Sequence, residues 1–344
     1  MIKSKTYFVT GGAGFIGSAF VRLLLDEVSN CKVINFDALT YAGNRDSLEG
    51  LEESRHHFVE GDIANKEAVL NALPEACEAL VNFAAESHVD RSIASAGEFL
   101  RTNVVGTQVL LDAARARRVK RFVQISTDEV MGSLPEDDTH YFSEQSPFAP
   151  NSPYAASKAA AEHLVRAAHH TFGLDTIITR CGNNYGPRQF PEKFLPLAIC
   201  NAMNNEPIPV YGDGQNVRDW IYVDDHCRAI LLALENGRAG AVYNIGARNE
   251  RRNMEVVESV LKLLGRPQSL IKFVKDRPGH DRRYAIDPSL IEDELGWRPM
   301  QTWETGLRET MQWYKENDGW LQRVRSGAYR DYYRSQYGTE VGAV

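Results

Sequence analysis

The 344-residue chain lacks the features that mark several protein classes. Apolar runs long enough to cross a membrane (roughly 18 residues) do not occur, and the formal net charge of −7 leaves no basic excess for nucleic acid. The cysteines are odd in number and show no Cys-x-x-Cys spacing, which favours free thiols in a reducing compartment over a disulfide framework. They are Cys31, Cys77, Cys181, Cys200 and Cys227.

Targeting and metal-binding signals are also missing. Lys3 and Lys5 precede an apolar run, but Gly11, Gly12, Gly14 and Gly17 interrupt it, so we expect no targeting segment and a cytoplasmic location. The pairs His56-His57 and His169-His170 have no carboxylate or cysteine at metal-ligand spacing, so no metal site is expected.

What the chain does contain is a regular alternation of short β-branched or aromatic runs with longer helical patterns. This alternation predicts an α/β fold with a doubly wound, parallel Rossmann sheet. The expected strands are Thr6–Thr10, Lys32–Phe36, His57–Glu60, Ala79–Phe83, Arg121–Ser126 and Thr176–Arg180. The expected helices are Phe15–Val28, Asn65–Leu73, Glu98–Arg117 and Tyr154–Phe172.

After Arg180 the composition changes to segments rich in Pro, Gly and Asn with scattered Arg. We expect residues 1–180 to form the dinucleotide-binding domain and residues 181–344 to form mainly a smaller, looser, interleaved C-terminal lobe that binds substrate. Residues 220–246 should return to the sheet, through Trp220–Leu234 and Val242–Ile245. The tail from Trp320, rich in Arg and Tyr, resembles a helical end piece.

A glycine-rich turn near the N-terminus predicts the cofactor site. Gly11-x-x-Gly14-x-x-Gly17 follows an expected strand and opens an expected helix, the context in which such a turn brings backbone N–H groups to a pyrophosphate. Asp37 lies twenty residues after Gly17, at the end of the second strand, where a carboxylate can hold both ribose hydroxyls. That charge would repel a 2′-phosphate, so we expect NAD rather than NADP, with Asp62 facing the adenine.

Two further segments carry reactive groups. Tyr154 and Lys158 are four residues apart on one helix face, where the ammonium and an oxidised nicotinamide would lower the pKa of the phenol toward neutrality. Asp128 and Glu129 end the strand before that helix, where burial can raise one pKa and leave a protonated acid beside an ionised base. The alternative for the carboxyl pair is a solvated acidic turn or a cap for the next segment.

Together these segments resemble the extended short-chain dehydrogenases/reductases, and more narrowly the dTDP-glucose 4,6-dehydratase family of NDP-sugar dehydratases. The resemblance runs from Thr6 to Gly338. Its motifs are Ala85-Glu-Ser-His-Val-Asp-Arg-Ser92, Ile125-Ser-Thr-Asp-Glu-Val130, Asn183-Asn-Tyr-Gly-Pro187, Phe190-Pro-Glu-Lys193, Val217-Arg-Asp-Trp220 and Asp276-Arg-Pro-Gly-His280.

The resemblance implies a redox-assisted loss of water that yields a 4-keto-6-deoxy sugar. Tyr154 would take the proton of the sugar 4-hydroxyl while hydride leaves C4 for NAD, with Thr127 bonding the same oxygen and Lys158 binding the nicotinamide ribose. Glu129 would then remove the acidified C5 proton while Asp128 protonates the leaving 6-hydroxyl, and hydride would return to C6. Without the keto group, the C5 carbanion has no stabilisation.

The same resemblance implies two sets of binding residues. NAD would contact Gly11, Gly14, Phe15, Ile16, Gly17, Asp37, Ala38, Leu39, Thr40, Asp62, Ile63, Ala84, Ala85, Thr102, Tyr154, Lys158 and Asn184. The nucleotide sugar would contact Ser87, Thr127, Asn183, Lys193, Phe194, Pro209, Val210, Tyr211, Arg218, Asn253, Asp276, Arg277, Pro278, Gly279 and His280. Arg218 has a physical reason as well, because a guanidinium binds phosphate oxygens bidentately.

One position departs from the family pattern. The family usually reads Asp-Glu-Val-Tyr-Gly, and this chain has Met131 where the tyrosine stands. We interpret Met131 as a packing change, and a shifted substrate or a changed fate of the intermediate is the alternative.

Family members pair their helices into a four-helix interface, so we expect a homodimer, with Leu110-Leu-Asp-Ala-Ala and the apolar face after Ala155 serving core or dimer packing. The residues leave three rivals: a dehydratase acting on UDP or another NDP-sugar, with an altered product; a sugar-nucleotide 4-epimerase; and an NAD-binding sensor without catalysis. An epimerase would have no use for Asp128 and Glu129, and an intact reactive set argues against the sensor.

Overall fold

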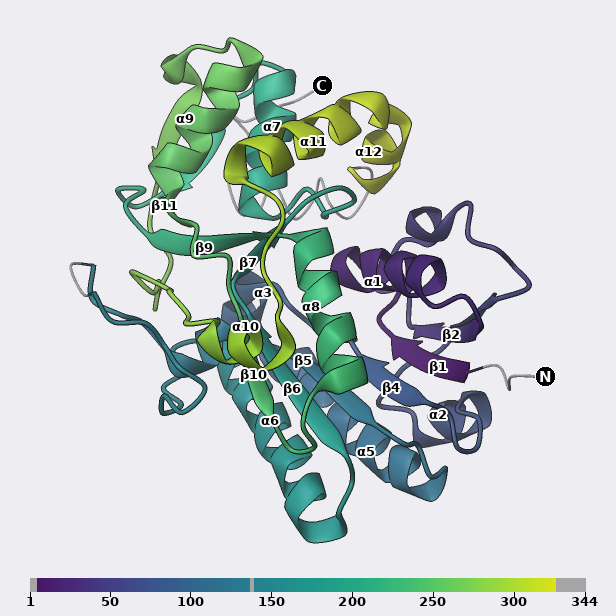
Figure 1. Ribbon diagram of the computed structural model, residues 1–344. Helices are drawn as coiled ribbons and strands as arrows, with labels where there is room; N and C mark the ends of the chain where they lie inside the picture. Colours follow the sequence, from purple (N-terminus) through teal and green to yellow (C-terminus); the bar gives the residue numbers. More distant parts are fainter. Residues whose placement is uncertain (1–4, 137–138, 326–344) are drawn as a thin grey trace.

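The computed structural model describes residues 5–136 and 139–325. Its central element is a seven-stranded sheet (Figure 1) in the order β10-β6-β5-β4-β1-β2-β3, with every neighbouring pair parallel. The strands are β1 (Lys5–Thr10), β2 (Cys31–Asp37), β3 (His56–Glu60), β4 (Ala79–Asn82), β5 (Phe122–Thr127), β6 (Thr176–Cys181) and β10 (Val242–Ile245). The predicted fold class is therefore confirmed, and each predicted strand boundary lies within one residue of the observed one.

Helices cover both faces of this sheet, as Figure 1 shows. On one face lie α1 (Phe15–Glu27) and α8 (Val223–Asn236); on the other lie α2 (Lys66–Ala72), α5 (Thr107–Ala116) and α6 (Pro153–Phe172). The alternation within β1 explains the arrangement, because Tyr7 and Val9 pack in the α1 and α8 core whereas Phe8 packs in the α2, α5 and α6 core.

The strand order reverses between β1 and β4. From β1 the chain proceeds outward to β2 and β3, and from β4 it proceeds in the opposite direction to β5 and β6. In open parallel sheets, ligands bind at the carboxyl ends of the strands next to such a switch point. The reversal therefore marks the position of the functional site before any side chain is considered.

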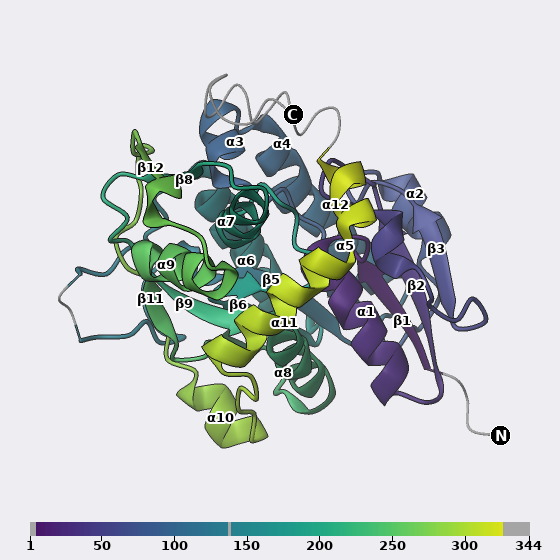
Figure 2. The same cartoon turned by 90° about the horizontal axis from the view of Figure 1, so that it is seen from above.

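A second group of elements lies beyond the carboxyl ends of the strands, and Figures 1 and 2 show α7, α9 and α11 gathered there. A three-stranded sheet comprises β7 (Asn183–Tyr185), β9 (Val217–Tyr222) and β11 (Glu250–Arg252), and a two-stranded parallel sheet comprises β8 (Ile208–Tyr211) and β12 (Ile271–Val274). The helices are α7 (Phe194–Met203), α9 (Asn253–Leu264), α11 (Trp303–Glu316) and α12 (Asp318–Val324).

This lobe is not loosely packed, contrary to what its Pro, Gly and Asn content led us to expect. It has its own buried core, in which Trp220, Trp303 and Trp320 pack with Tyr185 and the apolar faces of α7 and α9. Within the expected return to the large sheet, β10 joins that sheet and α8 covers it, but Trp220 belongs to β9 of the small sheet.

The predicted helix Glu98–Arg117 is divided. The chain forms a short α4 (Gly97–Phe99), then a π-helical segment η2 (Leu100–Gly106), and only then α5. Within η2, the Asn103 side chain accepts from the Glu86 N–H (2.9 Å) and donates to the Glu86 carbonyl (3.0 Å) and to the Ser157 hydroxyl (2.8 Å). The wider turn thus connects the loop after β4 to α6, and π-helical turns often occur at functional sites.

The remaining short elements are α3 (Val89–Ala94), α10 (Ser289–Leu295) and three 3₁₀ turns, η1 (Arg45–Leu48), η3 (Asp128–Met131) and η4 (Gln268–Leu270). All five cysteines are buried and free, which confirms the expectation of unpaired thiols. In the two described ranges, no helix has the length and apolar character needed to cross a membrane. The predicted tail beyond residue 325, including the match up to Gly338, lies outside the described residues.

Candidate active site

A cavity of about 360 Å³ opens at the carboxyl ends of β1, β2, β4, β5 and β6. It brings together predicted residues from across the first 193 positions of the chain. Its lining includes all five predicted catalytic residues, the predicted substrate residues Ser87, Asn183 and Lys193, and every predicted cofactor residue except Leu39. The glycine turn, the carboxyl pair and the Tyr154/Lys158 pair therefore line one cavity, whereas Arg218 and the segment from Asp276 to His280 are not among its lining residues.

The glycine turn has the close backbone contacts that exclude a side chain. Gly11 has φ +69°, and a Cβ atom there would lie 2.5 Å from the Ala84 nitrogen. A Cβ at Gly17 would lie 2.2 Å from the Gly11 carbonyl oxygen. Helix α1 starts directly after this turn without a side-chain cap and without an acidic residue in its first turn. The turn therefore presents uncapped N–H groups to the cavity, as an anion such as a pyrophosphate requires.

Asp37 lies at the end of β2 and is fixed by two backbone groups. Its Oδ2 accepts from the Ala13 N–H and its Oδ1 from the Leu39 N–H, both at 2.8 Å. Burial raises the pKa of Asp37, and these two hydrogen bonds act against that rise because they stabilise the ionised form. The carboxylate is thus held between the glycine turn and the loop after β2, facing the cavity.

Asp62 and Leu39 are placed less directly than expected. Asp62 lines the cavity, but its Oδ1 accepts from the Ala64 N–H at 2.8 Å and its Oδ2 forms an ion pair with Arg101. Leu39 adopts a positive φ of 48° and contributes its N–H to Asp37. Its effect on a ligand would therefore be indirect, through the position of that carboxylate.

The carboxyl pair follows the end of β5 in the short turn η3. The Thr127 hydroxyl donates to Asp128 Oδ1 (3.2 Å) and accepts from the Glu129 N–H (3.3 Å), so it orients both acids. Asp128 is only 2% exposed, and among the described residues its buried Oδ2 has no hydrogen-bond partner. The alternative of a solvated acidic turn is therefore excluded for Asp128.

The two carboxyls have different electrostatic surroundings. Burial, together with the charge of Glu129, raises the pKa of Asp128 well above its usual range. Burial also raises the pKa of Glu129, but the cations Arg277, Arg218 and Lys193 act against that rise. This pattern favours a protonated Asp128 beside an ionised Glu129, which is the acid and base arrangement that the adjacent carboxyls predict.

Tyr154 and Lys158 lie in the first turns of α6. The helix starts with Pro153 at its first position, and the Ser152 hydroxyl caps it by accepting from the Ala155 N–H at 3.1 Å. Lys158 donates from Nζ to the Ile125 carbonyl at 2.6 Å, next to the end of β5. Burial lowers the pKa of Lys158 to about 8.

The expected lowering of the Tyr154 pKa is not produced by the side chains of the protein. Burial raises that pKa well above its usual value, and Glu129, Cys181 and Asp128 raise it further. Only a hydrogen bond with Thr127 acts in the opposite direction. The helix spacing led us to weigh the lysine and to neglect the two carboxyls, which lie on a different segment.

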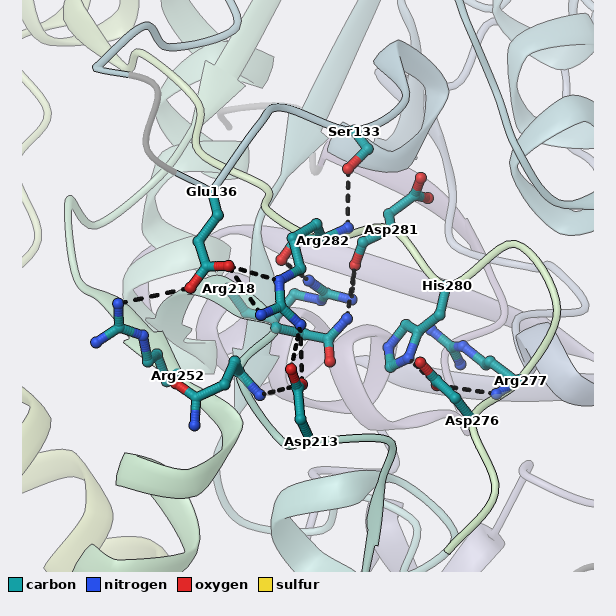
Figure 3. A network of polar contacts seen from close by, with 12 residues as sticks. Ser133, Glu136, Asp213, Arg218, Arg252, Asp276, Arg277, His280, Asp281 and Arg282 are labelled. Atoms are coloured by element: carbon teal, nitrogen blue, oxygen red, sulfur yellow. Dashed lines mark hydrogen bonds and ion pairs between the residues drawn. The ribbon is translucent and has the colours of Figure 1, made fainter.

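The substrate side of the site carries buried cations. Lys193 donates from Nζ to the Ser87 carbonyl at 2.8 Å. Arg218 donates to the carbonyls of Val217 (2.7 Å) and Asp281 (2.9 Å), and its guanidinium lies 4.2 Å from the centre of the Tyr284 ring. In Figure 3, Arg218 lies behind the Asp281 and Arg282 segment that holds it. Because these bonds use no carboxylate, the charge of Arg218 remains available to an anion.

The residues predicted to bind the base of the nucleotide come from segments that are far apart in the sequence. Strand β8 carries Tyr211 beside β12, and the loop after β12 brings His280 within 6.1 Å of the Tyr211 ring, centroid to centroid. The Tyr211 hydroxyl donates to Asp90 (3.3 Å), which also pairs with Arg277 (3.5 Å). Burial lowers the pKa of His280 to about 4, so its ring is neutral at physiological pH, and its Nδ1 lies 2.6 Å from Asp276.

Several predicted substrate residues are placed by the second lobe rather than by the cavity. The Val210 side chain is fully buried in the core of that lobe, and the Phe194 side chain packs partly buried against it. Asn253 starts α9, and its N–H donates to the Asn216 carbonyl. The roles of these residues, and of Pro209, Pro278 and Gly279, stay predictions.

Sequence reasoning also missed residues that line the cavity. They are Phe36, Ala42, Gly43, Gly61, Phe83, Glu86, Glu98, Arg101, Ile125, Ser126, Cys181, Gly182, Gln189, Phe190 and Glu192. Ser126 lies inside the quoted motif Ile125–Val130 but was given no role, and Gly182 lies one position before the motif that starts at Asn183. Glu192 pairs with Arg91 at 3.2 Å. Because the two residues are 101 positions apart, no local sequence pattern predicts this contact.

Comparisons with known proteins agree with this arrangement. The family model described as GDP-mannose 4,6 dehydratase matches residues 8–310. A dTDP-glucose 4,6-dehydratase of Xanthomonas campestris is 53% identical, with 94% of this chain and 97% of that protein covered.

Solved structures extend the comparison. The crystal structure of a dTDP-glucose 4,6-dehydratase from Streptomyces venezuelae, with NAD and TYD bound, is 50% identical with a TM-score of 0.90, covering 93% of this chain and 99% of that one. A UDP-glucose 4-epimerase of Thermus thermophilus in complex with NAD is 30% identical with a TM-score of 0.84, covering 91% and 99%. The chain is thus similar in fold to both enzymes and more similar in sequence to the dehydratases.

Proposed function

The chain belongs to the nucleotide-sugar 4,6-dehydratase family, and from this premise we propose that it dehydrates dTDP-glucose to dTDP-4-keto-6-deoxyglucose. The observation that carries the proposal is that the buried Asp128 and the partly buried Glu129 line one cavity with Tyr154 and Lys158. An epimerase needs only to oxidise and re-reduce one alcohol carbon, whereas water loss from C5 and C6 needs an additional acid and base. The site contains both sets of groups.

The cavity fits NAD in its backbone and in its charge. The glycine turn leaves no room for a Cβ atom at Gly11 or Gly17, and Asp37 presents an anchored carboxylate where a 2′-phosphate would be repelled. When bound, NAD supplies the acceptor for the hydride from C4 of the sugar and returns that hydride at C6. Lys158 would hold the nicotinamide ribose, and Ala84, Ala85 and Thr102 lie along the same wall.

Tyr154 is the proposed base for the sugar 4-hydroxyl. Because burial and the two carboxyls raise its pKa, Tyr154 can act as a base only when positive charge lies close to the phenol. Lys158, one helical turn along α6, provides one such charge. Thr127 bonds both Tyr154 and Asp128, so it can hold the 4-oxygen between the oxidation and elimination groups.

The elimination step follows from the protonation of the two carboxyls. Asp128, with its raised pKa, donates a proton to the leaving 6-hydroxyl, and Glu129, whose ionised form is favoured by Arg277 and Arg218, removes the proton from C5. The 4-keto group makes that C5 proton acidic, so the order of oxidation before elimination is required. One bond to oxygen breaks at C6, one bond to hydrogen breaks at C5, and water is released.

Substrate recognition is proposed from the cationic side of the site. Arg218, Arg277 and Lys193 would neutralise the diphosphate in an otherwise acidic protein, with Ser87 and Asn183 lining the cavity beside Lys193. Asn253 and Asp276 are proposed to contact the same nucleotide sugar. The base would lie between the β8 residues Pro209–Tyr211 and the loop from Asp276 to His280.

We also propose that the protein is a cytoplasmic homodimer. Within each chain, the first domain would end at about residue 180, and residues 220–246 would return to it. The exposed apolar residues Leu100 and Val105 of η2 support a covered surface beside α5 and α6, while Leu110 and Leu111 are already buried in the core. Sedimentation of the purified chain tests this directly, because a monomer would contradict it.

Isotope transfer tests the proposed reaction. Substrate deuterated at C4 should yield product deuterated at C6, with one solvent proton at C5 and no net NADH, as read by mass spectrometry and NMR. A panel of dTDP- and UDP-sugars serves as the specificity control. Return of the label to C4 would identify an epimerase, and an unchanged sugar would leave only a binding protein.

A further inference from the structure

A buried ion pair lies directly behind the catalytic strand end. Glu162 on α6 and Arg180 on β6 make three contacts, from Arg180 Nε to both Glu162 oxygens (3.1 Å each) and from Nη2 to Oε2 (2.8 Å). Both side chains are almost completely buried. None of the proposed catalytic steps uses either residue, and burying two charges has a substantial desolvation cost.

The pair connects β6 to α6, which carries Tyr154 and Lys158, and to the end of β5, which leads to the other catalytic groups. The Ser126 hydroxyl donates to Glu162 Oε1 at 2.6 Å, and Ser126 is the residue before Thr127. In the β5–β6 register Ser126 lies opposite Arg180, next to the cavity residue Cys181. Glu162 follows Lys158 by one helical turn, and Lys158 itself donates to the carbonyl of Ile125. Two successive residues of β5 are thus held by two successive turns of α6.

We propose that Glu162 and Arg180 are positioning residues for catalysis, which fix the end of β5 against α6 and place a negative charge beside Lys158. Through Ser126 they hold the backbone from which Thr127, Asp128 and Glu129 project. Through the charge of Glu162 they favour the ammonium form of Lys158. This inference rests on the proposed function in one respect, the role of Lys158. The contacts among Glu162, Arg180 and Ser126 do not depend on that function.

The surroundings of Lys158 determine the direction of the electrostatic effect. Burial lowers the pKa of Lys158, while Glu162 on the same helix and Cys181 on β6 raise it. Tyr154 one turn earlier and Asp128 and Glu129 after β5 line the same cavity as Lys158, and Arg180 on β6 pairs with Glu162. Removing the charge of Glu162 should therefore lower the pKa of Lys158 below about 8, so that the ammonium is lost at a lower pH.

Met131 ends the turn η3 that carries Asp128 and Glu129, and its side chain contacts the ion pair rather than the cavity. Its side chain is 2% exposed, and it packs with Val130, Leu134, Phe142 and Ala159. Its sulfur lies 3.6 Å from Arg180 Nη1, which also donates to the Glu144 carbonyl. Met131 is absent from the cavity lining. The position that departs from the family pattern is therefore a packing neighbour of the positioning pair.

The test compares Glu162→Gln with a matched ion pair on the same two strands. Arg121 and Asp175 join the opposite ends of β5 and β6 at 2.9 Å, far from the cavity residues, so Asp175→Asn removes a carboxylate between the same strands without touching the site. Because Glu162→Gln leaves Arg180 buried and unpaired, the double variant Glu162→Gln with Arg180→Met provides a folded alternative. Circular dichroism and thermal melting establish folding for each.

In folded protein we expect Glu162→Gln, or the double variant, to lower kcat by about tenfold or more while the sugar-nucleotide KM changes by less than about threefold. For Glu162→Gln the alkaline limb of kcat should shift by about 0.5 to 1 pH unit toward lower pH, and the shift should be smaller in the double variant, which removes a cation together with the anion. Asp175→Asn should show neither effect. A variant that folds and keeps the kcat and the pH profile of Asp175→Asn would overturn the proposal.

NAD affinity measured against pH, without sugar, separates this inference from the proposed reaction. In the unmodified protein NAD affinity should fall as the pH rises through about 8. In Glu162→Gln the same fall in NAD affinity should occur at a lower pH. This shift is expected even if the isotope experiment excludes a dehydratase. An unshifted NAD titration together with confirmed dehydration would reject the inference alone.

Discussion

Two ionic networks flank the site, and they are built in opposite ways. Behind β5, Glu162 and Arg180 are buried and join regular elements of the large sheet. On the substrate side, Arg282 is about one-third exposed and joins two loops, bonding Glu136 at 2.8 and 2.9 Å and Asp213 at 2.8 and 3.1 Å (Figure 3). Arginine–carboxylate pairs are therefore excluded from water behind β5 and partly exposed to water on the substrate side.

This difference indicates which part of the site is rigid and which part is sensitive to salt concentration. A buried pair is hardly screened by salt, and losing one partner leaves an uncompensated charge. An exposed pair contributes roughly 0 to 1 kcal/mol and weakens as salt rises. The chemistry is thus attached to the sheet, whereas the Asp281 and Arg282 carbonyls that hold Arg218 belong to a segment fixed by exposed contacts.

The largest expected effect is at the rigid end. The double variant Asp128→Asn with Glu129→Gln should keep NAD binding and slow C4 oxidation but lose water elimination, lowering turnover by about 100-fold to 10,000-fold because both the acid and the base are removed. NADH absorbance should accumulate without dehydrated product. Dehydratase turnover at the unmodified rate would remove the roles assigned to these two residues.

A smaller effect is expected at the exposed network. Arg282→Gln should raise the sugar-nucleotide KM by about twofold to fivefold at low salt, since the segment that holds Arg218 loses its side-chain contacts. High salt should bring the unmodified protein close to the variant. Steady-state kinetics at two ionic strengths measure both changes, and Arg323→Gln, which removes an exposed pair with Asp46 in another part of the molecule, is the control. If salt leaves the difference in KM intact, the network does not act through its charges.

No change of product or of sugar is expected for Met131→Tyr. Because Met131 contacts Arg180 and a small apolar cluster but not the cavity, the exchange should change turnover by less than about tenfold, or under roughly 1.4 kcal/mol in barrier. Product masses from a panel of nucleotide sugars check the result. A switch of product or sugar would show that Met131 sets specificity rather than packing.

The comparison also explains how much the sequence could predict. Residues at the rigid end follow strands within one or two positions, so the periodicity that places a strand also places Asp37, Asp128 and Glu129. Glu162 and Arg180 were not found because their pairing depends on how α6 packs against β6, which no local pattern contains. The carboxyls that raise the pKa of Tyr154 were overlooked for the same reason, since they come from another segment.

On the substrate side, a motif match could name residues but could not orient them. Val210 was expected to frame a base, yet its side chain is fully buried in the second core, because alternate positions of β8 face opposite sides. Tyr211, one position later, does face the His280 loop. Arg282 carried no signal at all, because its partners Glu136 and Asp213 lie 146 and 69 positions away.

The π-helical geometry of η2 depends on the exact number of residues in this segment. Deleting one residue between Leu100 and Gly106 would allow the segment to close into an ordinary α-helix, turning the residues before it by about 100° relative to α5. Leu110 and Leu111 would stay in the core, while Asn103 would rotate away from Glu86 and Ser157. Insertions and deletions that a surface loop tolerates would therefore be selected against here, even where every side chain is kept.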